Sequence, residues 1–184
     1  MTTTSDGTRT GAAERPPRVL PVREAVLVGD VLGISPPVCR ATWSQLSPLV
    51  AHGLARLRVD VLVAEAGRAR AELDDDDLAA GTEHLWVPDG DVPVACVRVV
   101  RDATGTPVVD RACARADVRR LGLVSALLTD VIARRGAGRL RALALPGSVT
   151  FFARHGFEVA GPPTGDVAAR VTPMLRYPES PWRD

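Results

Sequence analysis

The sequence predicts one α/β (α+β) domain, in which a mixed, mostly antiparallel sheet is flanked by helices. Three observations favour this fold class. Apolar residues recur every three or four positions in two long segments, which is typical of amphipathic helices. Short β-branched stretches separated by tight turns lie between these segments and are typical of antiparallel strands. A further strand-like stretch follows the second helix, so helices and strands belong to the same domain.

The composition indicates a globular protein and excludes several function classes. The chain has 184 residues, which is enough for one domain with a buried core. Its formal net charge is only +1, so we expect no nucleic-acid partner bound through a basic face. No apolar run approaches the ~20 residues of a membrane helix, and the N-terminus lacks the apolar core of a secretory signal. We therefore expect no membrane partner.

The cysteines point to a reducing compartment. Cys39, Cys96 and Cys113 are odd in number and widely spaced, and the sequence has no CxxC pair. A zinc site and a disulfide framework are both unexpected with this spacing. We therefore predict a cytoplasmic location and no bound metal.

The chain ends differ from the middle in composition. Residues 1–17 are polar and small, so we expect a disordered N-terminal tail. Residues 18–42 form an N-terminal extension of uncertain structure, whose β-branched run at 18–34 allows a strand. The domain itself is expected at 43–178, followed by a C-terminal tail at 179–184.

The first predicted helix begins at Ser47. This serine is a good N-cap, Pro48 suits the first helical position, and the apolar spacing continues to Val61. The polar stretch 66–81 follows and contains the run Asp74–Asp77. We expect that run to be a solvated loop, and a cation or amine-substrate site is the alternative.

Strands and turns dominate the next forty residues. Residues 84–87 and 93–101 are predicted strands joined by a turn at Pro88-Asp89-Gly90. Residues 107–116 form a further strand. The clearest helix covers 122–135. The predicted elements after it are a strand at 139–145, a short helix at 148–155, and strands at 156–160 and 168–176.

The segment from Arg111 to Ser125 carries the most chemistry. A strand enters a tight loop, and the helix begins at Gly122. The first amides of a helix have no internal partner and attract phosphate groups, and glycine lets a ligand approach the backbone. Arg119 and Arg120 add positive charge. The alternative is a plain strand-to-helix turn with solvated arginines.

Two motifs resemble the GNAT superfamily of acyl-CoA-dependent N-acyltransferases. Arg119 and Gly122 match its Arg/Gln-x-x-Gly-x-Gly/Ala motif, with Val124 in place of the last Gly or Ala. Phe151-Phe152-Ala-Arg-His-Gly156-Phe157 is similar to its Phe-Tyr-x-x-x-Gly-Phe signature. The stretches Leu57–Glu65, Gly81–Trp86 and Pro93–Val99 and the acidic loop Asp74–Asp77 resemble the ElaA-like branch in order and spacing. The resemblance covers roughly residues 43–176.

The resemblance implies a GNAT fold, an acyl-CoA donor, most simply acetyl-CoA, and direct transfer to an amine of a small molecule or protein. Cys113 and Ala114 should contact the pantetheine arm, and Phe152 should lie beside the leaving thiolate. The residues expected to hold the pyrophosphate are Arg119, Arg120, Leu121, Gly122, Leu123, Val124 and Ser125.

Two departures from the family pattern leave the activity open. The acid of the family is often the tyrosine that Phe152 replaces, and a phenyl ring cannot donate a proton. Val124 adds bulk at the phosphate loop. A catalytically degenerate GNAT-fold protein that binds acyl-CoA or a protein partner is therefore the alternative function. Glu65 is the candidate catalytic base or amine anchor, or else a surface carboxylate. The sequence leaves a homodimer open and names no acceptor.

Overall fold

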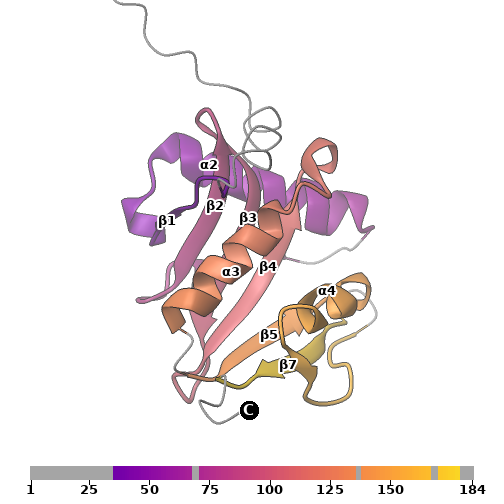
Figure 1. Cartoon of the computed structure of the whole chain (residues 1–184). Helices are drawn as coiled ribbons and strands as arrows, with labels where there is room; N and C mark the ends of the chain where they lie inside the picture. Colours follow the sequence, from indigo (N-terminus) through magenta and orange to yellow (C-terminus); the bar gives the residue numbers. More distant parts are fainter. Residues whose placement is uncertain (1–34, 68–70, 136–137, 167–169, 179–184) are drawn as a thin grey trace, which may run out of the picture.

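The protein has a mixed seven-stranded sheet with helices on both faces (Figure 1). The computed structural model describes residues 35–67, 71–135, 138–166 and 170–178. The sheet order is β1-β2-β3-β4-β5-β7-β6. Strands β4 and β5 pair in parallel, and the other neighbouring strands pair antiparallel, which confirms the predicted fold class. The strands are β1 (Cys39–Ala41), β2 (Glu83–Asp89), β3 (Val92–Arg101), β4 (Pro107–Ala114), β5 (Leu140–Ala144), β6 (Glu158–Val159) and β7 (Thr172–Arg176).

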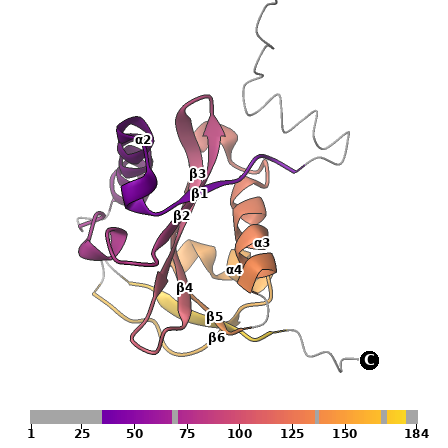
Figure 2. The same ribbon diagram turned by 90° about the vertical axis from the view of Figure 1, so that its left-hand side faces the viewer.

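Two helices cover opposite faces of the sheet, α2 (Pro48–Arg58) and α3 (Leu123–Arg135), as Figure 2 shows. A third helix, α4 (Val149–Ala153), lies beside β5. The remaining helical turns are short: η1 (Trp43–Gln45), the π-helical η2 (Val59–Glu65), η3 (Asp75–Asp77), η4 (Ala116–Val118) and η5 (Pro146–Ser148). Within the described parts of the chain, no helix is long and apolar enough to cross a membrane.

The start of α2 follows the expected capping chemistry. The Ser47 hydroxyl accepts a hydrogen bond from the Val50 amide at 3.3 Å, and Pro48 occupies the first turn. Leu54 and Leu57 are buried against the sheet. The helical path does not stop where α2 ends, because η2 continues it to Glu65 with wider π-helical turns. The sequence spacing did not indicate this change of helix type.

Each face of the sheet has its own apolar core. The larger core lies under α3 and joins Leu127 and Val131 to strand residues such as Val97 and Val99. The smaller core lies under α2 and η2 and includes Leu54, Leu57 and Leu62 with Cys96 and Cys113. Both thiols therefore belong to the α2 face.

The parallel strands β4 and β5 separate soon after they meet. Their register is recorded at Val108↔Arg141 and Val109↔Ala142, whereas β4 runs on to Ala114 and β5 to Ala144. A register shift between β3 and β4 follows Cys96, where Arg111 has a φ of 52°. Strand β4 thus bends away from β5, and the opening between them contains the candidate site.

The strands predicted at 84–87, 93–101, 107–116 and 139–145 are confirmed as β2, β3, β4 and β5, with small differences at their ends. The turn after β2 lies at Gly90-Asp91, two residues later than expected, because Pro88 belongs to the strand at a bulge. Strand β1 was not predicted. It lies before residue 43, so the sheet begins earlier than the expected domain boundary. The tail at 1–17, the strand allowed at 18–34 and the tail at 179–184 lie outside the described residues.

Candidate active site

The predicted phosphate loop has a backbone shape that suits an anion. Strand β4 ends at Ala114, and α3 begins at Leu123. Between them, Arg120 and Gly122 have φ values of 67° and 71°, in the left-handed region that favours glycine. The first intrahelical bond joins the Ala126 amide to the Gly122 carbonyl, so the preceding amides have no partner within the helix. A Cβ atom added to Gly122 would meet open space.

This loop forms one end of a cleft of about 600 Å³. Val61, Leu62 and Leu145 contribute apolar side chains to its walls, and Phe151 and Arg154 of the second motif also line it. Nine of the ten residues predicted to bind acyl-CoA line the cleft. They are Cys113, Ala114, Arg119, Arg120, Gly122, Leu123, Val124, Ser125 and Phe152. Leu121 is not in the lining and packs against the larger core instead.

A second cavity of about 200 Å³ adjoins the cleft on the α2 face. The two cavities share the lining residues Leu62, Ala112, Leu145, Ser148 and Phe152. The second cavity also has charged groups in its wall, Asp110 and Arg111. Ser148 places a hydroxyl group at the junction. Its role could not be predicted, because a single serine before a helix carries no distinctive pattern.

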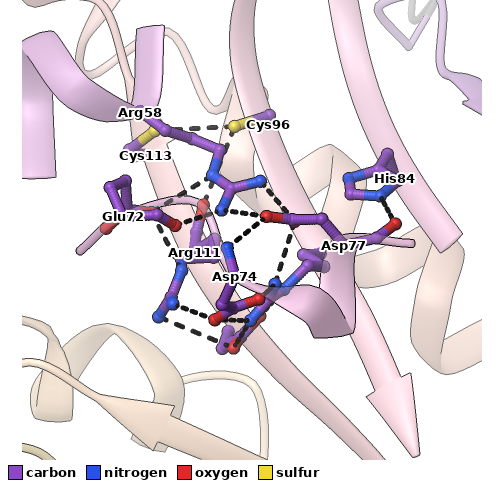
Figure 3. A network of polar contacts seen from close by, with 10 residues as sticks. Arg58, Glu72, Asp74, Asp77, His84, Cys96, Arg111 and Cys113 are labelled. Carbon is purple, nitrogen blue, oxygen red and sulfur yellow. Dashed lines mark hydrogen bonds and ion pairs between the residues drawn. The ribbon is translucent and has the colours of Figure 1, made fainter. Parts of the chain in front are cut away.

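The wall of the second cavity belongs to a buried ion-pair network (Figure 3). Arg98 donates to Asp110 through Nε and Nη2, at 2.9 Å and 2.7 Å. It also donates to Asp77 at 2.9 Å and to Asp74. Arg111 Nη2 donates to Asp74 at 2.7 Å, so the network reaches from the strands to the loop before β2.

A third guanidinium, that of Arg58, completes the network from the α2 side. Arg58 Nη1 donates to Asp77 at 2.7 Å, and its Nε donates to Glu72 at 3.1 Å (Figure 3). Glu72 Oε1 also lies 2.9 Å from Arg111 Nε. Arg58 and Arg98 are almost fully buried, with 1% and 2% of their surface exposed. Buried charges are stable only when paired and hydrogen-bonded, which these contacts provide.

The expectation of a solvated loop at Asp74–Asp77 is wrong for Asp77, whereas the other three aspartates of the run are exposed. Asp77 is only 3% exposed, and Asp74 is bonded to two arginines, whereas Asp75 and Asp76 remain exposed. Burial alone would raise the pKa of Asp77, but the hydrogen bond and charge of Arg58 outweigh it and lower that pKa to about 2. The run therefore anchors the loop to the sheet.

His84 has a structural role beside the network. Its Nε2 lies 3.2 Å from the Asp77 carbonyl, and its ring meets Trp43 edge-on. Burial lowers the pKa of His84, so the ring is neutral at pH 7 and does not add charge to the network.

Glu65 lies at the phosphate loop rather than at the second cavity. Its carboxylate accepts a hydrogen bond from Arg119 Nη2, and Arg119 Nε donates to the Ala114 carbonyl at 3.1 Å. Glu65 lines neither cavity. The geometry therefore does not favour the catalytic base or amine anchor that the sequence suggested.

The second motif forms the turn that places Phe152. The Phe157 amide donates to the Phe152 carbonyl at 3.2 Å, and Gly156 has a φ of 80°. The ring of Phe152 is 2% exposed and meets Phe151 and Phe157 edge-on. The sole tyrosine, Tyr177, lies under Arg139 and lines neither cavity, so it does not replace the missing phenol.

Comparisons with known proteins agree with this architecture. UPF0039 proteins of Mycobacterium bovis and Mycobacterium tuberculosis are each 33% identical to the chain over 142 residues, which is 74% of this chain and 91% of theirs. Escherichia coli ElaA has a TM-score of 0.66 at 21% identity, and an acyl-CoA N-acyltransferase from Pseudomonas aeruginosa has 0.67 at 21%. Each alignment covers 76% of this chain and 99% of the other, and at this identity the likeness concerns the fold. The family model described as "Acetyltransferase (GNAT) domain" matches residues 53–177, so the chain belongs to the GNAT acetyltransferase family.

Proposed function

We propose that the protein transfers an acyl group, most simply acetyl, directly from coenzyme A to a small amine. The observation that carries this proposal is the pair of adjoining cavities, one ending at the phosphate loop and the other at Asp110 and Arg111. Such an arrangement can hold donor and acceptor side by side, and proximity alone lowers the barrier of a two-substrate reaction.

In this proposal the pyrophosphate of the donor lies against the loop from Arg119 to Ser125. The unpaired helix amides and two guanidinium groups supply its hydrogen bonds and opposite charge. The pantetheine arm follows the edge of β4 near Cys113, where the separation from β5 leaves the edge open to the cleft. Without a bound donor, the Glu65 carboxylate forms an ion pair with Arg119, and in the proposed complex the pyrophosphate takes the place of that carboxylate.

The thioester then lies where the cavities meet, near Ala112, Ser148 and Phe152. The neutral amine approaches from the second cavity, and its nitrogen attacks the thioester carbonyl. The carbon–sulfur bond then breaks, and the nitrogen releases one proton to water. Asp110, held by Arg98, is the carboxylate that we assign to orienting the amine. The Phe152 ring cannot protonate the departing thiolate, so the proton comes from water or from the Ser148 hydroxyl.

The test combines binding and turnover on the full-length protein. Calorimetry should detect acetyl-CoA binding, and a thiol assay should show release of coenzyme A with at least one small amine of a broad panel. Absence of binding would refute the proposal. Binding without turnover would favour the second candidate, an acyl-CoA-binding protein without catalysis, for which the specific observation is the missing hydroxyl at Phe152.

We further propose a cytoplasmic location, because three widely spaced cysteines without a CxxC pair suit a reducing compartment.

A further inference from the structure

We propose that Cys96 and Cys113 form a redox-active dithiol in the wall of the cleft, which a disulfide of coenzyme A bound there converts to a disulfide. The dithiol itself rests on the geometry of β3 and β4. The choice of oxidant rests on the proposed function, because it assumes that the cleft binds coenzyme A derivatives.

The two cysteines are placed for bond formation. They are directly opposite each other on neighbouring antiparallel strands, and their Sγ atoms are 3.5 Å apart. Opposed residues on such strands have Cα atoms about 4.5–5.5 Å apart, which lies within the range of disulfides. The S–S bond is about 2.05 Å long, so the sulfur atoms need to approach by about 1.5 Å. Side-chain rotation can supply much of this movement while the strands keep their pairing.

Access to the pair is through the cleft. Cys113 lines the cleft, whereas Cys96 lies behind it, 2% exposed, in the smaller core under α2. The remaining thiol, Cys39, lies on the edge strand β1 opposite Trp86 of β2, and it lines none of the described cavities. An oxidant that binds in the cleft therefore meets Cys113 first.

The chemistry is two successive thiol–disulfide exchanges. The Cys113 thiolate attacks one sulfur of the coenzyme A disulfide, the disulfide bond breaks, and one coenzyme A thiolate leaves and takes a proton from water. Cys96 then loses its proton and attacks the Cys113 sulfur, which releases the second coenzyme A thiolate. The two protein thiols are oxidised, and the coenzyme A disulfide is reduced to two thiols.

The surroundings make the pair unreactive towards oxidants that the cleft does not hold. The hydrogen bond with Cys96 and burial raise the pKa of Cys113, and Glu72 acts in the same direction. The Arg58 guanidinium opposes them without overcoming them. Since the thiolate is the nucleophile, exchange from bulk solvent is slow at neutral pH, and a bound disulfide gains from its high local concentration.

The test uses the Cys39→Ser variant, in which the dithiol is the sole source of thiols. The reduced protein is incubated without oxygen with coenzyme A disulfide or with glutathione disulfide at equal concentration, and the products are mapped by mass spectrometry of proteolytic fragments. Coenzyme A disulfide should produce the Cys96–Cys113 disulfide at least about tenfold faster, and excess acetyl-CoA should slow it. With Cys96→Ser added, the reaction should stop at a coenzyme A mixed disulfide on Cys113.

Three outcomes decide between the parts of the proposal. Failure to form the Cys96–Cys113 bond even with diamide, a small general thiol oxidant, would overturn the dithiol. Equal rates with the two disulfides, without protection by acetyl-CoA, would overturn delivery through the cleft. Oxidation by diamide in a protein that does not bind acetyl-CoA would support the dithiol and refute the proposed function.

Discussion

Gly122→Val tests the phosphate loop with a single side chain. Gly122 has a φ of 71°, and an added Cβ would point into open space where the pyrophosphate is proposed to bind. A non-glycine residue in this conformation costs about 1–2 kcal/mol. For a domain of this size, that cost lowers the melting temperature by roughly 2–8 °C. The valine should also keep the loop amides from the ligand and weaken acetyl-CoA binding by at least about tenfold, or about 1.4 kcal/mol.

Gly90→Val is the matched control for this experiment. Gly90 has a φ of 60° in the turn between β2 and β3, an added Cβ would also meet open space, and it lines neither cavity of the site. Both variants should lose similar thermal stability, measured by scanning calorimetry, whereas the loss of affinity in titration calorimetry should be confined to Gly122→Val. If the folded Gly122→Val protein binds acetyl-CoA as tightly as the wild type, the phosphate-loop assignment is wrong.

Four further predictions concern charge and catalysis. Glu65→Gln should tighten acetyl-CoA binding by about two- to fivefold at low salt, because the Glu65 carboxylate no longer competes with the pyrophosphate for Arg119 in their half-exposed ion pair. An unchanged dissociation constant would contradict this. Asp77→Asn should lower the free energy of unfolding by about 3–5 kcal/mol in urea titrations, while the exposed Asp76→Asn changes it by less than about 0.5 kcal/mol. The pKa of Asp77 in the folded protein is about 2, below its ordinary value of 3.8. Its ionised carboxylate should therefore contribute about 2 kcal/mol to the free energy of unfolding above pH about 5, and this contribution should be lost as the pH falls towards 2. A free energy of unfolding that stays constant across this pH window would be the contrary result. Phe152→Tyr should raise the rate of coenzyme A release up to about a hundredfold if the new hydroxyl protonates the thiolate, and an equal or lower rate in the folded variant would show that the acid lies elsewhere.

The order of strands and helices could be predicted because each element has a local signal. The capping serine and Pro48 set the start of α2, and alternating β-branched residues marked β3 and β4. The phosphate loop was likewise predictable, because an arginine and a glycine before a Leu-rich helix are local in the chain. Nearly all of the residues named from that pattern line one cleft.

The ion-pair network could not be predicted from the run of aspartates. Asp77 is bonded to Arg58, 19 positions earlier, and to Arg98, 21 positions later, and no local pattern joins them. A charge run is usually solvated, so burial of one member depends on how α2 and the sheet pack together. The same reasoning applies to Glu65, whose partner Arg119 is 54 positions away.

The two-cavity arrangement was also beyond the sequence. It depends on the separation of β4 from β5 after Val109, which follows from sheet register rather than from residue type. The placement of Ser148 at the junction arises from the same geometry.

The most direct test of the proposed function is a crystal structure of the protein with acetyl-CoA. We expect the pyrophosphate against the amides of residues 119–125 and the Arg119 side chain turned from Glu65 towards it. We also expect the thioester carbonyl at the junction lined by Ala112, Ser148 and Phe152, with the second cavity free for the amine. Acetyl-CoA bound elsewhere, or bound in the cleft with its thioester remote from that junction, would contradict the proposed function.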